Sequence, residues 1–249
     1  MKSAAVRILR RSISIAFAAL AVGSPALAQE LSLDFGDGPT STGRIVQIVI
    51  MVTVLTLAPS ILVMVTSFTR IVVVLSFLRT AMGTQSAPPN TVIVSLALFL
   101  TGFVMAPVLE DVYAGGIRPL MDGEITEQEA FDRAIVPIRE FMLVHVREQD
   151  LRLFVDMARS EAQTAEEAPL SALIPAFMIS ELRRAFEIGF LIFLPFLVID
   201  MVVASVLMSM GMMMLPPVMI SLPFKLIFFV LVDGWYLVAG SLVESFNTV

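Results

Sequence analysis

Apolar residues gather into four long segments of this chain, and most polar residues lie between the second and the third segment. The segments are Ile45–Phe68, Thr91–Val108, Phe186–Leu207 and Phe224–Val243. Each is close to the ~20 apolar residues that a helix needs to cross a hydrocarbon core of about 30 Å. The pattern predicts an all-α chain of integral-membrane type, in which about four long, proline-broken helices form two hairpins.

The first predicted hairpin covers residues 45–109, and its two segments are joined by a turn-rich connector, Gly83–Asn90. Arg70 and Arg79 flank the apolar run before this connector, and Arg79 adjoins it. Because cytoplasmic loops carry an excess of Lys and Arg, this bias favours a connector on the cytoplasmic side. The polar stretch that follows the hairpin is then expected on the outer side of the membrane.

That polar stretch, residues 110–171, is strongly acidic: Glu110–Ser171 holds fourteen Asp and Glu, six Arg and no Lys. Thr126 and Glu129 have the spacing of a capping box that starts a helix. Apolar residues then recur at helical spacing in two runs: Phe131, Ala134, Ile135, Ile138, Phe141 and Met142, and then Leu151, Phe154, Val155 and Ala158. Two amphipathic helices follow, each with one apolar stripe that needs a partner.

The large aromatic side chains of these helices are candidates for self-assembly. We expect Phe141 and Phe154 at a contact between copies of the chain, with Glu181 near the junction to the third apolar segment. The alternative is that both rings belong to a core within one chain. His145, the single histidine, is expected to be a surface or packing residue.

The N-terminus has the features of a signal peptide over residues 1–28. Its first eleven residues carry four cations, and the short apolar run Ser12–Val22 and the site Ala26-Leu27-Ala28 follow. Cleavage after Ala28 leaves Gln29 as the new N-terminus. The polar segment 29–44 then lies outside the cytoplasm. A retained first transmembrane helix fits less well, because the apolar run is short.

Charged residues occur within or beside the third and fourth segments, where they are costly unless paired or hydrated. We treat them as candidates for buried charge or assembly: Glu181, Arg183, Arg184, Glu187, Asp200, Lys225 and Asp233. Glu187 is three or four residues from both arginines, so it can pair within one helix. Asp200 and Lys225 come to similar depth if the segments fold back on each other, which makes a pair across the hairpin or between subunits plausible.

The second hairpin, residues 172–249, turns at a methionine-rich loop. Residues 208–219 contain six of the sixteen methionines. Gly211, Pro216 and Pro217 break a continuous helix there. Methionine is unbranched and polarizable, so such a loop suits a compliant seal, although it is also ordinary apolar filler elsewhere.

Composition narrows the class of protein. The chain is 57% hydrophobic and only 15% charged, which differs from a soluble globular domain. It has no cysteine, so disulfides and thiolate metal sites are excluded. Its net charge is −6 and becomes more negative once the basic N-terminus is removed, so nucleic acid is an unfavourable partner.

Two long strings resemble the FliP family of flagellar export-gate proteins. One is SFTRIVVVLSFLRTAMGTQSAPPN, residues Ser67–Asn90. The other, within Leu173–Phe246, comprises LIPAFMISELRRAFEIGFLIFLPFLVIDMVVASVLMSMGMMMLPP and LPFKLIFFVLVDGWYLVAGSLVESF. The injectisome homologues of the same family are the alternative, and the cleavable signal peptide favours the flagellar branch.

The resemblance implies a pore subunit of the type III export gate in the bacterial inner membrane, within the flagellar basal body. Such proteins form a homo-pentamer with FliQ and FliR, near FlhA and FlhB, and unfolded flagellar subunits pass through the centre. Most of the chain is expected on the periplasmic side, with hairpins that largely rise above the lipid. The resemblance assigns a gasket to the loop, with Met208 at its edge: Met210, Met212, Met213 and Met214. It implies no enzyme activity and no cofactor.

Two other functions were weighed from the residues. Asp200 and Asp233 could form the dyad of an intramembrane aspartyl protease, in which two carboxylates share a proton and activate water. Gly234, next to Asp233, would allow close approach of a substrate. Clustered thioethers also suit Cu(I) transport, although the lack of Cys and the single His argue against it.

Overall fold

The computed structural model describes residues 39–84, 86–159, 162, 164–212 and 215–247. Its described elements are all helical, with no strand among these residues, which confirms the all-α prediction. The expected signal peptide, its cleavage site between Ala28 and Gln29, and the first part of the polar segment lie outside the described residues. The chain divides into two compact units, residues 1–54 and 55–249.

The first apolar segment is followed by a second, separate helix. Helix α2 spans Pro39–Val65 with Pro59 inside it, and α3 spans Phe68–Ala81. The apolar run that contains Arg70 is therefore a helix of its own. Helix α4, Asn90–Val112, continues through a π-helical turn, η1 (Tyr113–Ile117), into the short α5 (Arg118–Met121).

The acidic region contains the two amphipathic helices that the sequence predicts. Helix α6 spans Glu127–His145 and α7 spans Glu148–Met157. The capping box is present: Thr126 accepts a hydrogen bond from the backbone of Glu129, whose side chain accepts one from the backbone of Thr126. Ser180 on α8 (Leu170–Ser209) accepts a hydrogen bond from the Arg147 backbone and donates one to Asp150, which fixes the start of α7 on α8.

The third apolar segment is longer than predicted. Helix α8 is continuous over the 40 residues Leu170–Ser209, whereas hydropathy placed the start of the segment at Phe186. The charges Glu181–Glu187 interrupt the apolar pattern but not the helix. At about 1.5 Å per residue α8 is ~60 Å long, twice the thickness of a hydrocarbon core, so it cannot lie wholly within one.

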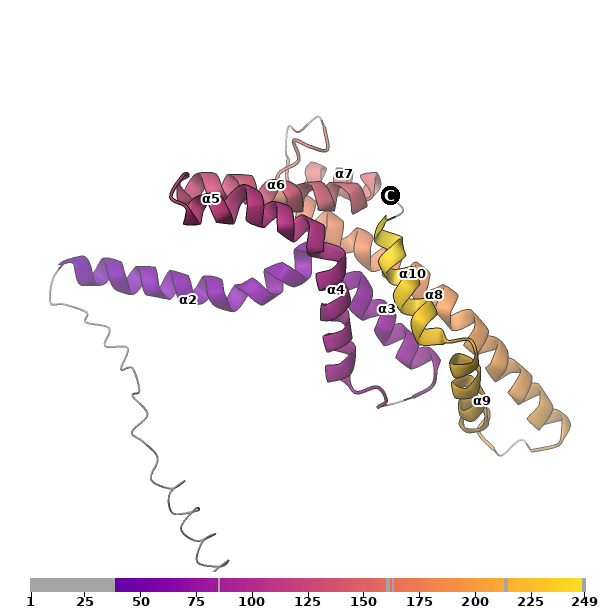
Figure 1. The fold of residues 1–249 in the computed structure, drawn as a ribbon. Helices are drawn as coiled ribbons and strands as arrows, with labels where there is room; N and C mark the ends of the chain where they lie inside the picture. The colour runs from indigo at the N-terminus through magenta and orange to yellow at the C-terminus, as the bar shows by residue number, and fades with distance from the viewer. Residues whose placement is uncertain (1–38, 85, 160–161, 163, 213–214, 248–249) are drawn as a thin grey trace, which may run out of the picture. The chain divides into compact units, whose positions relative to one another are not determined.

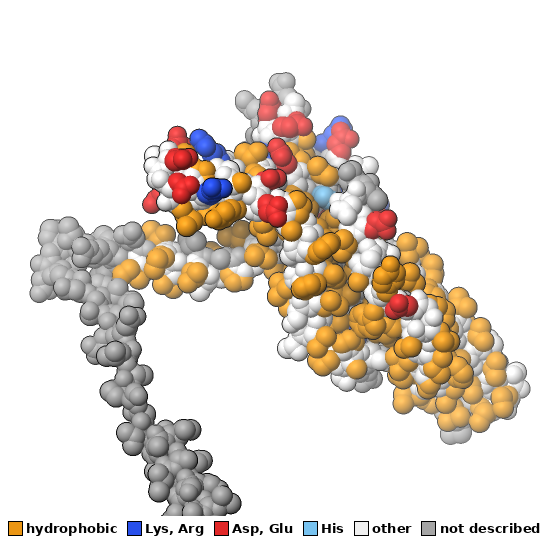
Figure 2. All heavy atoms as spheres, viewed as in Figure 1, with side chains coloured by type: hydrophobic (Ala, Val, Ile, Leu, Met, Phe, Trp, Pro, Cys, Tyr) orange, Lys and Arg blue, Asp and Glu red, His pale blue; other side chains and the backbone are white. Residues whose placement is uncertain are grey.

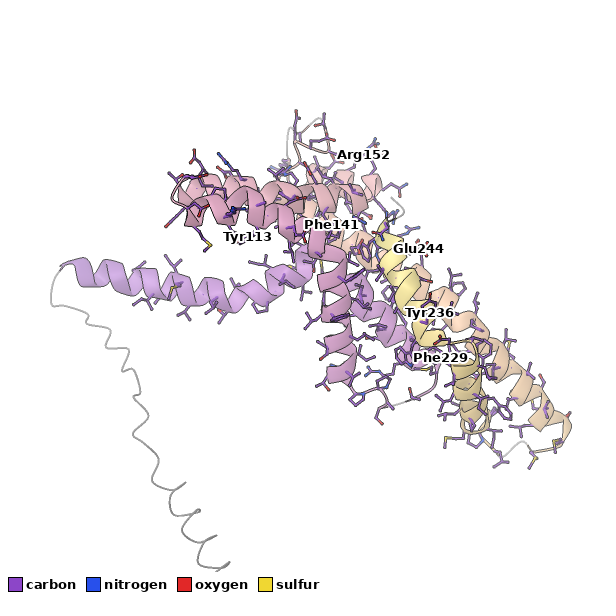
Figure 3. The ribbon with its side chains drawn as sticks, viewed as in Figure 1. Tyr113, Phe141, Arg152, Phe229, Tyr236 and Glu244 are labelled. Atoms are coloured by element: carbon purple, nitrogen blue, oxygen red, sulfur yellow. The ribbon has the colours of Figure 1, made fainter. Side chains whose placement is uncertain are left out.

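The fourth apolar segment is a broken helix. The segment consists of α9 (Pro217–Leu231) and α10 (Gly234–Asn247), which are bent by 64° relative to each other. Asp233 adopts the left-handed conformation with φ 52°, which ends α9. Phe229, labelled in Figure 3, lies over Gly234 so closely that a Cβ there would be 2.1 Å from its ring. Only glycine fits at this bend.

Helices of the second unit pack around α8 and α3 (Figure 1). Helix α3 contacts α4 on one side and α8 on the other, α6 and α7 contact α8, and α9 folds back along α8. The main core joins α3, α4 and α8 through Ile71, Leu75, Ile93, Ala97, Leu173 and Phe177. Residues of α6, α7 and α10 close the same cluster.

Within the part of the chain that the structure describes, two helices are long and apolar enough to cross a membrane, Asn90–Met121 and Leu170–Ser209. The number rises to four if each bent pair, Ile48–Leu57 with Pro59–Val65 and α9 with α10, counts as one span. Figure 2 shows acidic side chains over α5 to α7 and a nearly continuous hydrophobic surface over α8 and α9. The polar and apolar parts of the second unit are thus clearly separated.

Candidate functional site

The methionine-rich loop connects the C-terminus of α8 to the N-terminus of α9, and both ends have a common helix-terminus geometry. Gly211, with φ 74°, follows the last turn of α8. Met212 donates its backbone N–H to the Leu207 carbonyl and Gly211 donates to Met208. This double hydrogen bond is a Schellman motif, which requires the left-handed conformation that glycine adopts without strain.

The other end of the loop is set by proline. Pro216 is the N-cap of α9 and Pro217 its first residue. Proline suits this position because the first helical N–H has no partner within the helix. The structure therefore places Gly211, Pro216 and Pro217 at the hairpin turn, as the sequence predicted.

Methionine side chains on this loop are open to solvent. The exposed fraction is 61% for Met208, 66% for Met210 and 42% for Met212. Met213 and Met214 lie outside the described residues. These three thioethers and that of Met219, which is 68% exposed, do not pack into the core of their own chain, so they are not core filler there.

Near the loop, a partly buried ion pair joins the two arms of the hairpin; the Lys225 side chain is 5% exposed and the Asp200 side chain 31%. Lys225 Nζ on α9 lies 2.6 Å from Asp200 Oδ2 on α8, and Ser221 donates to the other carboxylate oxygen at 2.5 Å. The same ammonium donates to the carbonyl of Ala81, the last residue of α3, at 3.3 Å. Lys225 thus connects the second hairpin to the end of α3, a link that the sequence did not reveal.

A second ion pair, missed by the sequence reasoning, lies at the other end of α3. Arg70 donates from Nε to Glu181 Oε2 at 2.8 Å and from Nη2 to Oε1. Nη1 donates to the carbonyl and hydroxyl oxygens of Ser245 on α10, and the guanidinium carbon lies 3.7 Å from the centre of the Phe246 ring. Arg70 and Glu181 are 1% and 0% exposed.

Arg70 flanks an apolar run in the sequence and was expected to act as a topology signal there, but in the structure it is buried. Its side chain joins α3, α8 and α10, because each of its three nitrogen atoms donates to an acceptor within the protein. The sequence signal for this pair was that Arg70 and Glu181 each interrupt an apolar run. Their sequence separation of 111 positions gave no basis for pairing them.

The remaining charged candidates are separate from these two pairs. Arg183 donates to Glu187 at 2.9 Å on an exposed face of α8. Of the two arginines expected as partners of Glu187, Arg183 and Arg184, the structure thus pairs it with Arg183. Asp233 is exposed at the end of α9. Arg184 is half-buried on α8.

The protease hypothesis finds no support in this arrangement. The oxygens of Asp200 are engaged by Lys225 and Ser221, and Asp233 is not among their partners. The space beside Gly234, which was considered for a substrate, is taken by the ring of Phe229. Asp233 instead serves to terminate α9.

Phe141 lies in the core of its own chain (Figure 3). Its ring stacks on Phe246 at 6.2 Å and meets Phe177 edge-on at 5.9 Å. Phe154 is partly buried against the same core, and Glu181 is held by Arg70. This placement favours the intrachain alternative over a contact between copies.

His145 is buried beside the Arg70 pair. Its ring lies 4.6 Å from that of Phe141 and 5.3 Å from that of Phe246. Nδ1 is 2.8 Å from the Phe141 carbonyl and donates to it, whereas Nε2 is buried with no partner among the described residues. Burial lowers the pKa of His145, and the charge of Arg70 lowers it further. The residue is a packing histidine, one of the two roles expected for it.

A large apolar surface surrounds the loop hairpin. Phe190, Met201 and Val202 of α8 are more than half exposed. Between α8 and α9 is an apolar groove of about 500 Å³, lined in part by Val202, Ile220 and Phe224. Exposed apolar surface of this extent marks a contact with protein or lipid.

Comparison with known proteins gives one consistent result. A model described as the FliP family matches residues 51–242. The chain is 60% identical to the flagellar biosynthetic protein FliP of Caulobacter vibrioides over 238 residues, which covers 95% of this chain and 90% of that protein. It is 56% identical to the protein of the same name from Bacillus subtilis, over 84% of this chain and 95% of the relative. It is 50% identical to the flagellar biosynthetic protein FliP of Aquifex aeolicus, over 81% of this chain and 86% of that protein.

Proposed function

This chain belongs to the FliP family, and from that membership and the exposed methionine loop we propose that it is a pore-forming subunit of the flagellar type III protein export gate. In this proposal, unfolded flagellar subunits cross the inner membrane through the gate. The loop at residues 208–219 closes the pore between transport events. The relatives reported above all carry flagellar names, which favours this role over an injectisome homologue.

The observation that carries the seal is the exposure of Met208, Met210 and Met212 on a fixed turn. A narrow ring of apolar side chains excludes water and ions by dewetting. Thioether chains also change rotamer at little cost, so they can yield to a passing polypeptide. The turn holds the loop backbone in position while the side chains adapt.

Assembly of several subunits follows from the apolar surface of α8 and α9. A homo-pentamer with FliQ and FliR, close to FlhA and FlhB, would cover this surface in part with protein and in part with lipid. The length of α8 supports hairpins that project from the bilayer toward the periplasm, since ~60 Å exceeds a core of about 30 Å. Native mass spectrometry of the detergent-purified complex would count the copies and identify the two partners.

A conductance measurement tests the seal. Met212, Met213 and Met214 are changed together to Ala, which shortens the side chains without adding polarity. We expect an assembled complex with raised permeability to protons and small ions. The matched control is Met121→Ala with Met157→Ala, two exposed methionines far from the loop in sequence. An Ala variant that assembles normally and conducts no more than this control contradicts the seal.

A further inference from the structure

Helix α4 carries an exposed apolar stripe that ends in a carboxylate. Phe99 and Phe103 are 74% and 65% exposed, and Glu110 is exposed near the C-terminal end of the helix. With 3.6 residues per turn these three residues lie on one face of α4. Glu110 has no ion-pair partner among the described residues. The α4 stripe, defined by these three residues, is therefore apolar along its length and negative at one end.

Helix α8 carries an exposed stripe with a cation at its end. Arg183, Phe190 and Leu194 lie on one face of α8 by the same helical spacing. Phe190 is 64% exposed, Leu194 is 40% exposed and the Arg183 side chain 58%. Arg183 donates from Nε to Glu187, and its other two nitrogen atoms have no acceptor among the described residues. The α8 stripe, defined by these three residues, can thus accept a second carboxylate at its positive end.

The two stripes match when they are read in opposite directions. On α4 the two phenylalanines come seven and eleven residues before the carboxylate, and on α8 the two apolar residues come seven and eleven residues after the cation. Two antiparallel helices with this register therefore bring together both the apolar residues and the opposite charges. The resulting pairs are Glu110 with Arg183, Phe103 with Phe190, and Phe99 with Leu194.

Within one chain the stripes lie on different sides of α3, which contacts α4 on one side and α8 on the other (Figure 1). Helix α3 runs in the same direction as α8, because Arg70 pairs with Glu181 and Phe77 lies against Gly189. Helix α4 folds back after the α3–α4 connector and so runs opposite to α8. Copies related by rotation about an axis along these helices keep this relation. The α4 of one copy then meets the α8 of the next copy in the antiparallel orientation.

We propose that the α4 stripe of one copy docks on the α8 stripe of the neighbouring copy in this register. The contact joins two different faces, so it repeats head to tail and can close into a ring. An apolar groove of about 320 Å³, lined in part by Phe77 and Phe190, borders the α8 stripe and is open to the neighbour's Phe103. Complementary charges at one end fix the register. A lipid chain would fill the groove but would leave both charges unpaired. The inference rests on the proposed assembly of several copies in the gate.

Disulfide cross-linking of the full chain in cell membranes tests this contact. The chain has no cysteine, so introduced thiols are the only ones that it carries. Phe103→Cys with Phe190→Cys, treated with copper phenanthroline, should give a ladder of dimers, trimers and larger species on a non-reducing gel. Each single variant alone should give no dimer, and the two single variants made together should give dimers but no ladder. A disulfide within one chain, seen as a shifted monomer band, overturns the inference.

The register has its own control. Phe103→Cys with Met201→Cys uses a position that is 62% exposed on the same face of α8. Met201 lies eleven residues, about 16 Å, beyond Phe190 along the helix. A disulfide needs Cα atoms within about 7 Å, so cross-linking of this control should be at least roughly tenfold weaker. Equal ladders from the two cysteine pairs would show that the stripes do not meet in the proposed register.

Charge reversal tests the polar end. Glu110→Arg should weaken the ladder of the Phe103–Phe190 cysteine pair by roughly tenfold, because it sets two cations against each other. Adding Arg183→Glu should restore most of the ladder. Asp111→Arg is the matched control, since this exposed carboxylate is the next residue but lies about 100° around the helix. Immunoblots correct for the amount of chain in the membrane. Equal losses from Glu110→Arg and Asp111→Arg, or no recovery in the double variant, contradict the pairing.

Failure of this contact and failure of the proposed assembly give different results. If native mass spectrometry of the purified complex finds several copies but the cysteine pair gives no ladder, the assembly stands and the contact between stripes is excluded. A single copy in the complex excludes the proposed assembly as well. A cross-link from Phe190→Cys to a different protein, in place of a second copy, also overturns the inference.

Discussion

Arg70 and Glu181, on α3 and α8, form a two-pronged ion pair that is closed to solvent although 111 residues separate them in the sequence. Ser245 and Phe246 of α10 complete the surroundings of the guanidinium. Three helices thus meet at one cation. The pair ties the first and second hairpins together at the end of α3 that is remote from the α3–α4 connector.

Removing one partner of this pair should destabilise the chain strongly. Arg70→Ala or Glu181→Ala leaves a buried charge without its partner, at a cost of about 3–5 kcal/mol in the free energy of unfolding. The double change Arg70→Met with Glu181→Leu should recover much of the loss, because no charge remains. Thermal unfolding of the purified chain in detergent measures each variant.

The exposed pair Arg183–Glu187 on the same helix is the control. Its removal should cost less than about 1 kcal/mol, as is usual for surface pairs. If Arg70→Ala and Arg183→Ala lower the unfolding temperature equally, the buried pair does not have the role assigned to it.

Single changes at Asp200 or Lys225 should impair assembly and motility. Asp200→Ala leaves the buried Lys225 without its partner, at a cost of up to about 3–5 kcal/mol, whereas Lys225→Ala leaves the partly exposed Asp200 and should cost less. Exchange of the two charges should restore function only in part, because an aspartate at position 225 would face the carbonyl of Ala81. Native gels report assembly and soft agar reports motility. Harmless single changes, or effects that simply add, would disprove the pairing.

These two pairs show what the sequence could and could not predict. Asp200 and Lys225 lie on either side of one hairpin turn, so their distances in sequence from Gly211 predicted that they lie at a similar level along the hairpin. Arg70 and Glu181 lie on different hairpins, and no local spacing relates them. The same limit explains the start of α8: hydropathy measures polarity, whereas a helix continues through charges that find partners, as Glu181 does on α3 and Arg183 and Glu187 do within α8.

The loop itself was predictable because its signals are local. Gly211 and the Pro216-Pro217 pair specify a helix end and a helix start by backbone chemistry alone. By contrast, the bend between α9 and α10 depends on the contact of Phe229 with Gly234, and Asp233 gave no sequence signal of a left-handed residue. Aspartate adopts that conformation less readily than glycine.

His145 should make the protein less stable in mild acid. Burial and Arg70 hold its pKa below the ordinary 6.5, so as the pH falls below 6.5 the unfolded chain takes up a proton before the folded one. The free energy of unfolding therefore decreases as the pH falls from 6.5 toward the folded pKa, and His145 has no such effect above that window. His145→Gln should flatten this decrease. Denaturant unfolding between pH 7.5 and about 5 tests it, and an unchanged slope in the variant would contradict the assignment.

Gly234→Ala should destabilise the bend between α9 and α10. The new Cβ would lie 2.1 Å from the ring of Phe229, so either the ring or the helix has to move. Phe229→Leu in the same chain should relieve part of the loss by removing the ring. Gly240→Ala on the same helix is the control, since a Cβ there meets nothing within 4 Å. Equal unfolding temperatures for Gly234→Ala and Gly240→Ala would show that the contact does not determine the bend.

Changing Met212, Met213 and Met214 to Val should slow export and leave the gate closed to ions. Valine is apolar, so the ring still repels water, but its branched Cβ leaves few χ1 rotamers. A passing polypeptide then meets side chains that yield less than thioethers do. The same three changes to Leu, which is branched one carbon farther out, provide the control and should slow export less. Secretion of hook or filament subunits into the medium, measured against the amount of assembled gate, gives the rate. Export by the Val variant at the rate of the unaltered chain would show that flexibility of the loop side chains does not limit transport.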